Sequence, residues 1–73
     1  MKLPAISGDG AVTAFSHLGY EIDRQRGSHI LLRHPEPPHR RLSIPRHPEL
    51  AKGTLRKLIR EAGLTVEEFL RLL

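Results

Sequence analysis

The sequence contains no cysteine, no glycine-rich phosphate-binding loop and no long run of apolar residues. The lack of cysteine excludes disulfides and thiolate metal ligands. The lack of a phosphate-cradling loop argues against nucleotide hydrolysis. No segment approaches the roughly 20 apolar residues of a transmembrane helix, and the N-terminus has no apolar run long enough for a signal peptide. We therefore expect residues 1–73 to form a single cytoplasmic domain with no membrane contact and no small-molecule cofactor.

Positive charge is the first feature that points to a function. Nine arginines and three lysines stand against eight acidic residues, which gives a net charge of +4. The excess lies mostly between Arg24 and Lys52, where the only acids are Glu36 and Glu49. Such a segment suits phosphate, because contact with it releases counterions from nucleic acid. The plainer alternative is a solvated, charged surface.

The spacing of apolar residues predicts six secondary-structure elements. They are a helix over residues 8–18, strands over 20–25, 28–34 and 40–45, a helix over 54–62 and a short last helix after Thr65. Ser7 is the expected N-cap of the first helix and Gly19 its expected stop. Tyr20 and Ile22 alternate with polar residues, which predicts a half-buried first strand.

The order α-β-β-β-α, with an extra turn or helix at the end, predicts an α+β fold. Short turns favour an antiparallel three-stranded sheet, and the first turn is expected at Arg26 and Gly27. Two amphipathic helices can cover one face of such a sheet, which is the layout of a double-stranded-RNA-binding domain. The helix over residues 54–62 has an apolar stripe, and Arg56, Lys57 and Arg60 lie on its other face.

Alternation along the second strand predicts which of its side chains face solvent. Ser28, Ile30 and Leu32 share one face, whereas His29, Leu31 and Arg33 share the other. If Ile30 and Leu32 pack on the helices, His29 emerges on the open face beside Arg33.

Histidine is the second feature that points to a function, because its charge changes near the pH of the cell. Four of the five histidines lie between His29 and His47. His47 is either a general-acid partner of His29 or a structural residue of a proline-rich connector, and we favour the structural role. His34 and His39 flank a loop and are expected to be exposed. No histidine pair has the helical spacing of a zinc site, so we expect no metal site.

Gly27-Ser28-His29 by itself is a weak motif, and a surface histidine near a turn is its plainer interpretation. Considered as a whole, however, the chain resembles the HicA (YcfA-like) toxin family. The resemblance covers nearly the whole chain, and its pieces stand in the family's order and spacing. They are Leu3-Pro4, Ser7-Gly8, Leu18-Gly19-Tyr20, Arg24-Gln25-Arg26-Gly27-Ser28-His29, Arg33-His34-Pro35, Ile44-Pro45-Arg46-His47, Leu50, Gly53-Thr54-Leu55, Ile59, Ala62-Gly63-Leu64 and Glu67-Glu68-Phe69.

The resemblance implies a fold like that of double-stranded-RNA-binding domains, cleavage of messenger RNA and neutralisation by a HicB-like antitoxin. His29 matches the family's catalytic histidine. The loop from Pro35 to His39 departs from the family, whose members more often have a glycine-containing turn there.

The chemistry is consistent with this, because RNA carries its own nucleophile, the 2′-hydroxyl. A histidine with an ordinary pKa of about 6.5 can remove its proton or protonate the leaving oxygen. Arginines can bind the phosphate oxygens through paired hydrogen bonds. The expected RNA-binding residues are Arg24, Arg26, Ser28, Arg33, Arg40, Arg41 and Arg46.

Two other functions use the same residues. A noncatalytic RNA-binding module would bind RNA on the same basic sheet without cutting it. A structural or partner-binding domain would direct its positive charge at an acidic protein.

Overall fold

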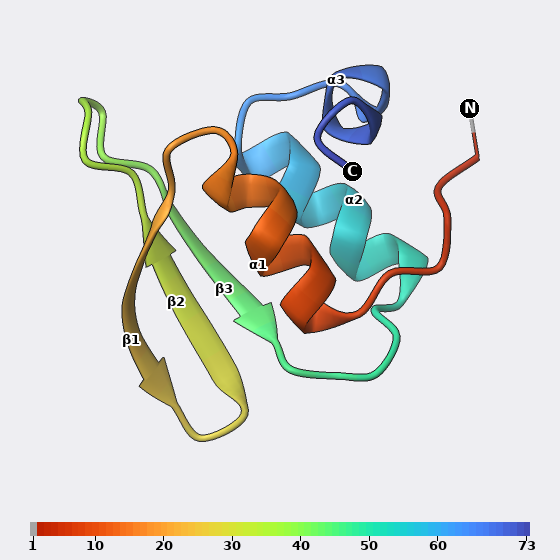
Figure 1. Ribbon diagram of the computed structural model, residues 1–73, viewed down its shortest axis with the longest axis horizontal. Helices are drawn as coiled ribbons and strands as arrows, with labels where there is room; N and C mark the ends of the chain where they lie inside the picture. Colours follow the sequence, from red (N-terminus) through yellow and green to blue (C-terminus); the bar gives the residue numbers. More distant parts are fainter. Residues whose placement is uncertain (1) are drawn as a thin grey trace.

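The computed structural model describes residues 2–73 and has the predicted α+β architecture (Figure 1). A three-stranded antiparallel sheet in the order β1-β2-β3 packs on one face against helices, with β3 nearest to them. The elements are α1 (Gly8–Ser16), β1 (Glu21–Arg26), β2 (His29–Arg33), β3 (Arg41–Pro45), α2 (Lys52–Glu61) and α3 (Val66–Leu70). This arrangement is consistent with the layout of a double-stranded-RNA-binding domain.

Helix α1 begins where the sequence predicts and ends two residues earlier. The Ser7 hydroxyl accepts a hydrogen bond from the Gly10 amide at 2.9 Å, which is the predicted N-cap. The helix ends at Ser16 with His17 as its C-cap, and Gly19 follows with φ of 99°. Glycine adopts this left-handed conformation without steric cost, so Gly19 redirects the chain towards the sheet.

The first strand differs from its prediction because it is not half-buried. All six of its residues are exposed, and the Ile22 side chain is 62% exposed. The reason is that β1 is the edge strand farthest from the helices, so its inner face has nothing to pack against. Tyr20, just before the strand, is buried and packs against Phe15 of α1 instead.

Helix α2 begins at Lys52, two residues before the predicted start, without a side-chain N-cap. Its stripe of Leu55, Leu58 and Ile59 is buried, as the spacing predicts. Thr65 and Glu68 form the predicted capping box of α3. The hydrogen bonds from the Thr65 backbone and hydroxyl favour the charged carboxylate, so they lower the pKa of Glu68.

The hydrophobic core lies between the inner face of the sheet and the helices. Ile30 and Leu32 of β2 and Leu42 and Ile44 of β3 supply the sheet side. The helices supply a list of buried residues that includes Ala11, Ala14, Phe15, Leu55, Leu58, Ile59 and Phe69. Within residues 2–73, no helix is both long and apolar enough to span a bilayer. Because the inner face is filled, the outer face of β2 and β3 is left as the open face of the sheet.

Candidate nucleic-acid interface

The outer face of the sheet carries His29, as alternation along β2 predicts. Ile30 and Leu32 are buried, whereas His29 and Arg33 are exposed and Leu31 is half-buried. Residues directly opposite one another on neighbouring strands point to the same face. The register therefore places three rows across the open face, namely Arg26–His29–Pro45, Arg24–Leu31–Ser43 and Glu21–Arg33–Arg41.

A β-bulge brings the arginines of β1 onto this face. Ile22 pairs with Leu32 on the inner face, but Arg24 pairs with Leu31 on the outer face. Strict alternation would keep Ile22 and Arg24 on one face, so the extra residue at Asp23 reverses the phase of the strand. Arg24 and Arg26 consequently join His29 on the open face.

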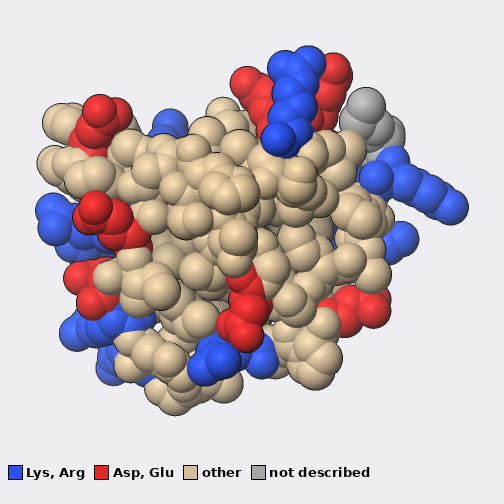
Figure 2. All heavy atoms as spheres, in the orientation of Figure 1, with Lys and Arg blue, Asp and Glu red and all other residues tan. Residues whose placement is uncertain are grey.

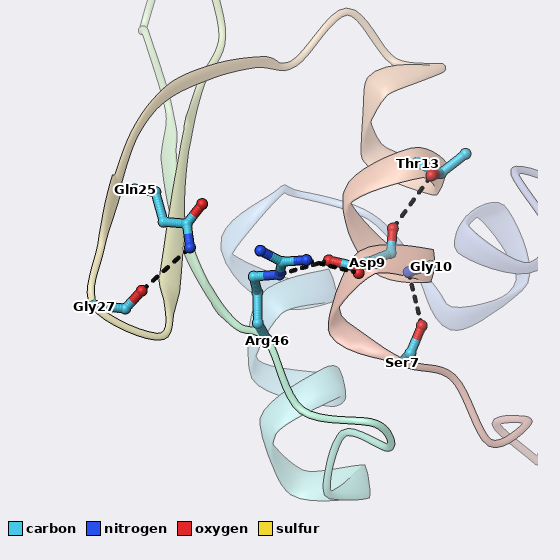
Figure 3. Close-up of polar contacts among 7 residues, drawn as sticks. All are labelled: Ser7, Asp9, Gly10, Thr13, Gln25, Gly27 and Arg46. Atoms are coloured by element: carbon cyan, nitrogen blue, oxygen red, sulfur yellow. Dashed lines mark hydrogen bonds and ion pairs between the residues drawn. The ribbon is translucent and has the colours of Figure 1, made fainter.

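Hydrogen bonds fix the hairpin that carries His29. The two-residue turn consists of Gly27 and Ser28, so it lies one position later than the predicted turn at Arg26 and Gly27. Gly27 has a φ of 57°. The side-chain amide of Gln25 donates from Nε2 to the Gly27 carbonyl at 3.2 Å (Figure 3). The Arg46 amide donates to the Ser28 carbonyl at 2.7 Å, which ties the turn to the end of β3. These hydrogen bonds therefore fix the backbone next to His29, at the start of β2.

A groove of about 580 Å³ runs along the open face from β1 to α2. Its lining residues are Asp23, Arg24, His29, Leu31, Leu32, Arg41, Leu42, Ser43, Pro45, Thr54, Lys57, Leu58 and Glu61. Three of them are cations from three different elements, namely Arg24, Arg41 and Lys57. Two others, Asp23 and Glu61, are acidic. The groove therefore combines an exposed imidazole with more cations than acids, which is an arrangement suited to a phosphate-bearing ligand.

The cations of the open face have no carboxylate partner. Among residues 2–73, ion pairs form at Arg46 with Asp9 and at Arg71 with Glu67, both away from the groove. Arg33 and Arg41 stand directly opposite each other, which is unfavourable for two like charges, and Glu21 stands opposite Arg33 on its other side. In Figure 2, basic and acidic side chains lie together along the sheet side of the molecule, whereas the central surface in that view is largely uncharged. The open face thus carries several cations that form no ion pair within the described residues.

A family model of the HicA toxin of bacterial toxin-antitoxin systems matches residues 8–64 of the chain. The chain belongs to the HicA toxin family. The match runs from the start of α1 to just beyond α2, so it includes every residue of the groove. A toxin of such a system has a cognate antitoxin as its partner. A search of individually curated proteins found no match.

Two of the arginines predicted to bind RNA are engaged elsewhere in this HicA chain. Arg46 forms a two-point ion pair with Asp9 of α1, at 3.1 and 3.3 Å (Figure 3). Arg40 donates to the Glu61 carbonyl at 3.0 Å, at the C-terminal end of α2. Ser28 is a turn residue beside the groove rather than in it. Of the predicted arginines, Arg24 and Arg41 line the groove. Arg26 shares a row of the sheet with His29, and Arg33 shares one with Arg41.

The other histidines lie outside the groove of the HicA domain. The His47 side chain is exposed, and its carbonyl accepts a hydrogen bond from the Gly8 amide at 2.9 Å, so its backbone has a structural role. The prediction that His34 is exposed is wrong. Its Nε2 bonds the Leu18 carbonyl at 2.8 Å, and its ring packs edge-on against Tyr20. His39 is exposed, as expected.

Two further observations complete the chemistry of the HicA domain. Burial raises the pKa of Tyr20, although the nearby charge of Arg40 partly offsets this effect. Within the described part of the chain, no three histidine or acidic side chains are grouped closely enough to hold a metal ion.

Sequence patterning missed Lys57 as a groove residue, because it assigned the charged side of α2 to solvent.

Proposed function

We propose that this HicA toxin is an endoribonuclease that cleaves messenger RNA without a metal ion, with His29 as its catalytic residue. One observation carries the proposal. His29 is an exposed histidine in a cationic groove, and no hydrogen bond within residues 2–73 engages its ring. Both ring nitrogens are therefore available to a substrate. HicA toxins are generally ribonucleases, which supports the same activity.

The reaction needs little from the protein because the nucleophile belongs to the RNA. The 2′-oxygen attacks the adjacent phosphorus, the bond to the 5′-oxygen breaks, and a 2′,3′-cyclic phosphate and a 5′-hydroxyl result. His29 removes the 2′-proton or protonates the departing 5′-oxygen. Arg24 and Arg41 stabilise the negative charge that builds on the phosphoryl oxygens.

A noncatalytic RNA-binding module is the second candidate, because the cationic open face would serve it equally well. Incubation of the purified protein with labelled RNA separates the two. Fragmentation of the RNA supports the nuclease. A salt-sensitive mobility shift without fragmentation supports the binding module. Neither effect would favour a domain that binds only proteins.

The antitoxin is the other expected partner of the groove, and we propose that it is HicB-like. To neutralise the toxin, it would cover the open face and place acidic side chains against the cations there. Arg26, Arg33 and Arg41 lie on this face and would meet these acids, whereas Arg40, another candidate by its charge, donates to the end of α2 instead. Such complementary charge accelerates association and makes the rate fall as salt rises.

We expect RNA and the antitoxin to compete for one site on the catalytically inactive His29→Ala protein. The measurement is displacement of a fluorescent RNA by increasing antitoxin. Competitive displacement, with an association rate that falls as salt rises, is the expected result. Simultaneous binding of both would show that the antitoxin acts from another surface, such as the side of α2 that carries Arg56 and Arg60.

A further inference from the structure

The groove has a second wall, which is formed by one face of α2. Thr54, Lys57 and Glu61 are spaced by three, four and seven residues, so they lie on the same side of the helix. This side borders β3, at the opposite end of the groove from the bulged strand β1. The groove thus has at least one cation on each wall, although Asp23 and Glu61 also line it.

Lys57 has no evident structural task. Its side chain is exposed, and within residues 2–73 it forms no ion pair. Glu61, four residues later, is the natural helical partner of Lys57, but the two do not pair. Arg40 donates a hydrogen bond to the backbone carbonyl of Glu61, so this contact does not involve the Glu61 carboxylate, which also lines the groove. The ammonium of Lys57 is therefore free to bind an anion in the groove.

We propose that Lys57 is a positioning residue that binds a phosphate of the RNA strand next to the one that is cut. This inference rests on the proposed ribonuclease function. Lys57 and His29 line the same groove from α2 and β2, and β3 lies between these two elements. From its side of the groove, Lys57 engages a flanking phosphate, while His29 and Arg24 face the reacting one. The strand consequently lies across the sheet, from β1 to α2.

The groove favours the RNA backbone over its bases. Proteins that grip bases of a single strand use exposed aromatic rings for stacking. Here Phe15, Tyr20 and Phe69 are all buried in the core, and the chain has no tryptophan. The groove offers the imidazole of His29 and the half-buried Leu31 and Pro45 as flat or apolar surface, whereas its other leucines are buried. Binding must therefore depend mainly on phosphate contacts, to which Lys57 adds one.

The test compares Lys57→Gln with Arg56→Gln, a matched control. The two residues are adjacent on α2 and exposed, and each change removes one positive charge, but only Lys57 lines the groove. Affinity for a short single-stranded RNA is measured by fluorescence anisotropy at several salt concentrations, on the His29→Ala background. We expect Lys57→Gln to weaken binding about five-fold and to reduce the salt slope by about 0.7, the value for one phosphate on a single strand. Arg56→Gln should change affinity less than two-fold.

A kinetic measurement on the active protein distinguishes positioning from general charge. Lys57→Gln should raise KM for RNA more than it lowers kcat, and Lys57→Arg should restore most of the affinity. Equal effects of Lys57→Gln and Arg56→Gln would overturn the inference, because net charge alone would then explain them. Weaker binding to the antitoxin with unchanged binding to RNA would also overturn it. If the wild-type protein neither binds nor cuts RNA, the proposed function itself is wrong. If the wild-type protein binds and cuts RNA but Lys57→Gln behaves like Arg56→Gln, only the role of Lys57 is wrong.

Discussion

Replacing His29 with alanine is expected to lower the rate of RNA cleavage by about 10²–10⁴-fold, the range for loss of a general acid or base. Growth inhibition by the expressed toxin should disappear with it. The fold should survive, because the His29 side chain is exposed and makes no hydrogen bond within residues 2–73. Surface changes of this kind alter the free energy of unfolding by about 0.5 kcal/mol or less. The measurement is single-turnover cleavage of labelled RNA, alongside a thermal melt.

His47→Ala is the matched control for this experiment. His47 is also exposed, and no hydrogen bond within residues 2–73 engages its ring, but it lies outside the groove. Its removal should leave cleavage close to the wild-type rate. A His29→Ala protein that cut RNA at the wild-type rate would remove His29 from the mechanism. Loss of cleavage in His47→Ala would instead make His47 the general acid.

Gly8→Ala is expected to lower the free energy of unfolding by at least about 2 kcal/mol, because a side chain at Gly8 has no space. A Cβ there would overlap the carbonyl oxygen of Pro45 and crowd Arg46. The obstacle is backbone, so the start of α1 and the end of β3 would have to separate. For a domain of this size, such a loss corresponds to a fall in Tm of roughly 8–16 °C. Thermal unfolding followed by circular dichroism measures it.

Gly53→Ala is the matched control. Gly53 lies in the first turn of α2, and a Cβ there would meet no atom within 4 Å. This change should therefore be neutral or should stabilise the protein by about 0.4–1 kcal/mol. Because Pro45 pairs directly with His29, we also expect Gly8→Ala to lower cleavage, even at temperatures where it remains folded. Equal stability of the two variants would contradict the close approach of α1 to β3.

Much of the fold could be predicted because the periodic patterns of β2, β3 and α2 matched their burial, whereas that of β1 did not. Ile30 and Leu32 face the helices, so the placement of His29 on the open face followed from simple alternation. The bulge at Asp23 could not be predicted, since nothing in the sequence of β1 marks the extra residue. Because of this bulge, Arg24 shares a face with His29 rather than with Ile22.

The limits of the site prediction have a similar cause. Local patterning predicts which face of an element is apolar, but not which elements end up side by side. Arg46 forms an ion pair with Asp9, which is 37 residues away in sequence, and Arg40 donates a hydrogen bond to the end of α2. Lys57 enters the groove because α2 packs beside β3. Each of these outcomes depends on tertiary contacts that a helical or strand period does not contain.

Cleavage of a 2′-O-methyl RNA, compared with unmodified RNA of the same sequence, tests the central claim most directly. Both oligonucleotides are incubated with the wild-type protein in excess chelator, and the products are analysed for their end groups. The account predicts that both bind, that only the unmodified RNA is cut, and that its fragments carry 2′,3′-cyclic phosphate ends. Cleavage of the methylated RNA, or activity that chelator abolishes and a divalent metal restores, would contradict a metal-independent reaction of the 2′-hydroxyl.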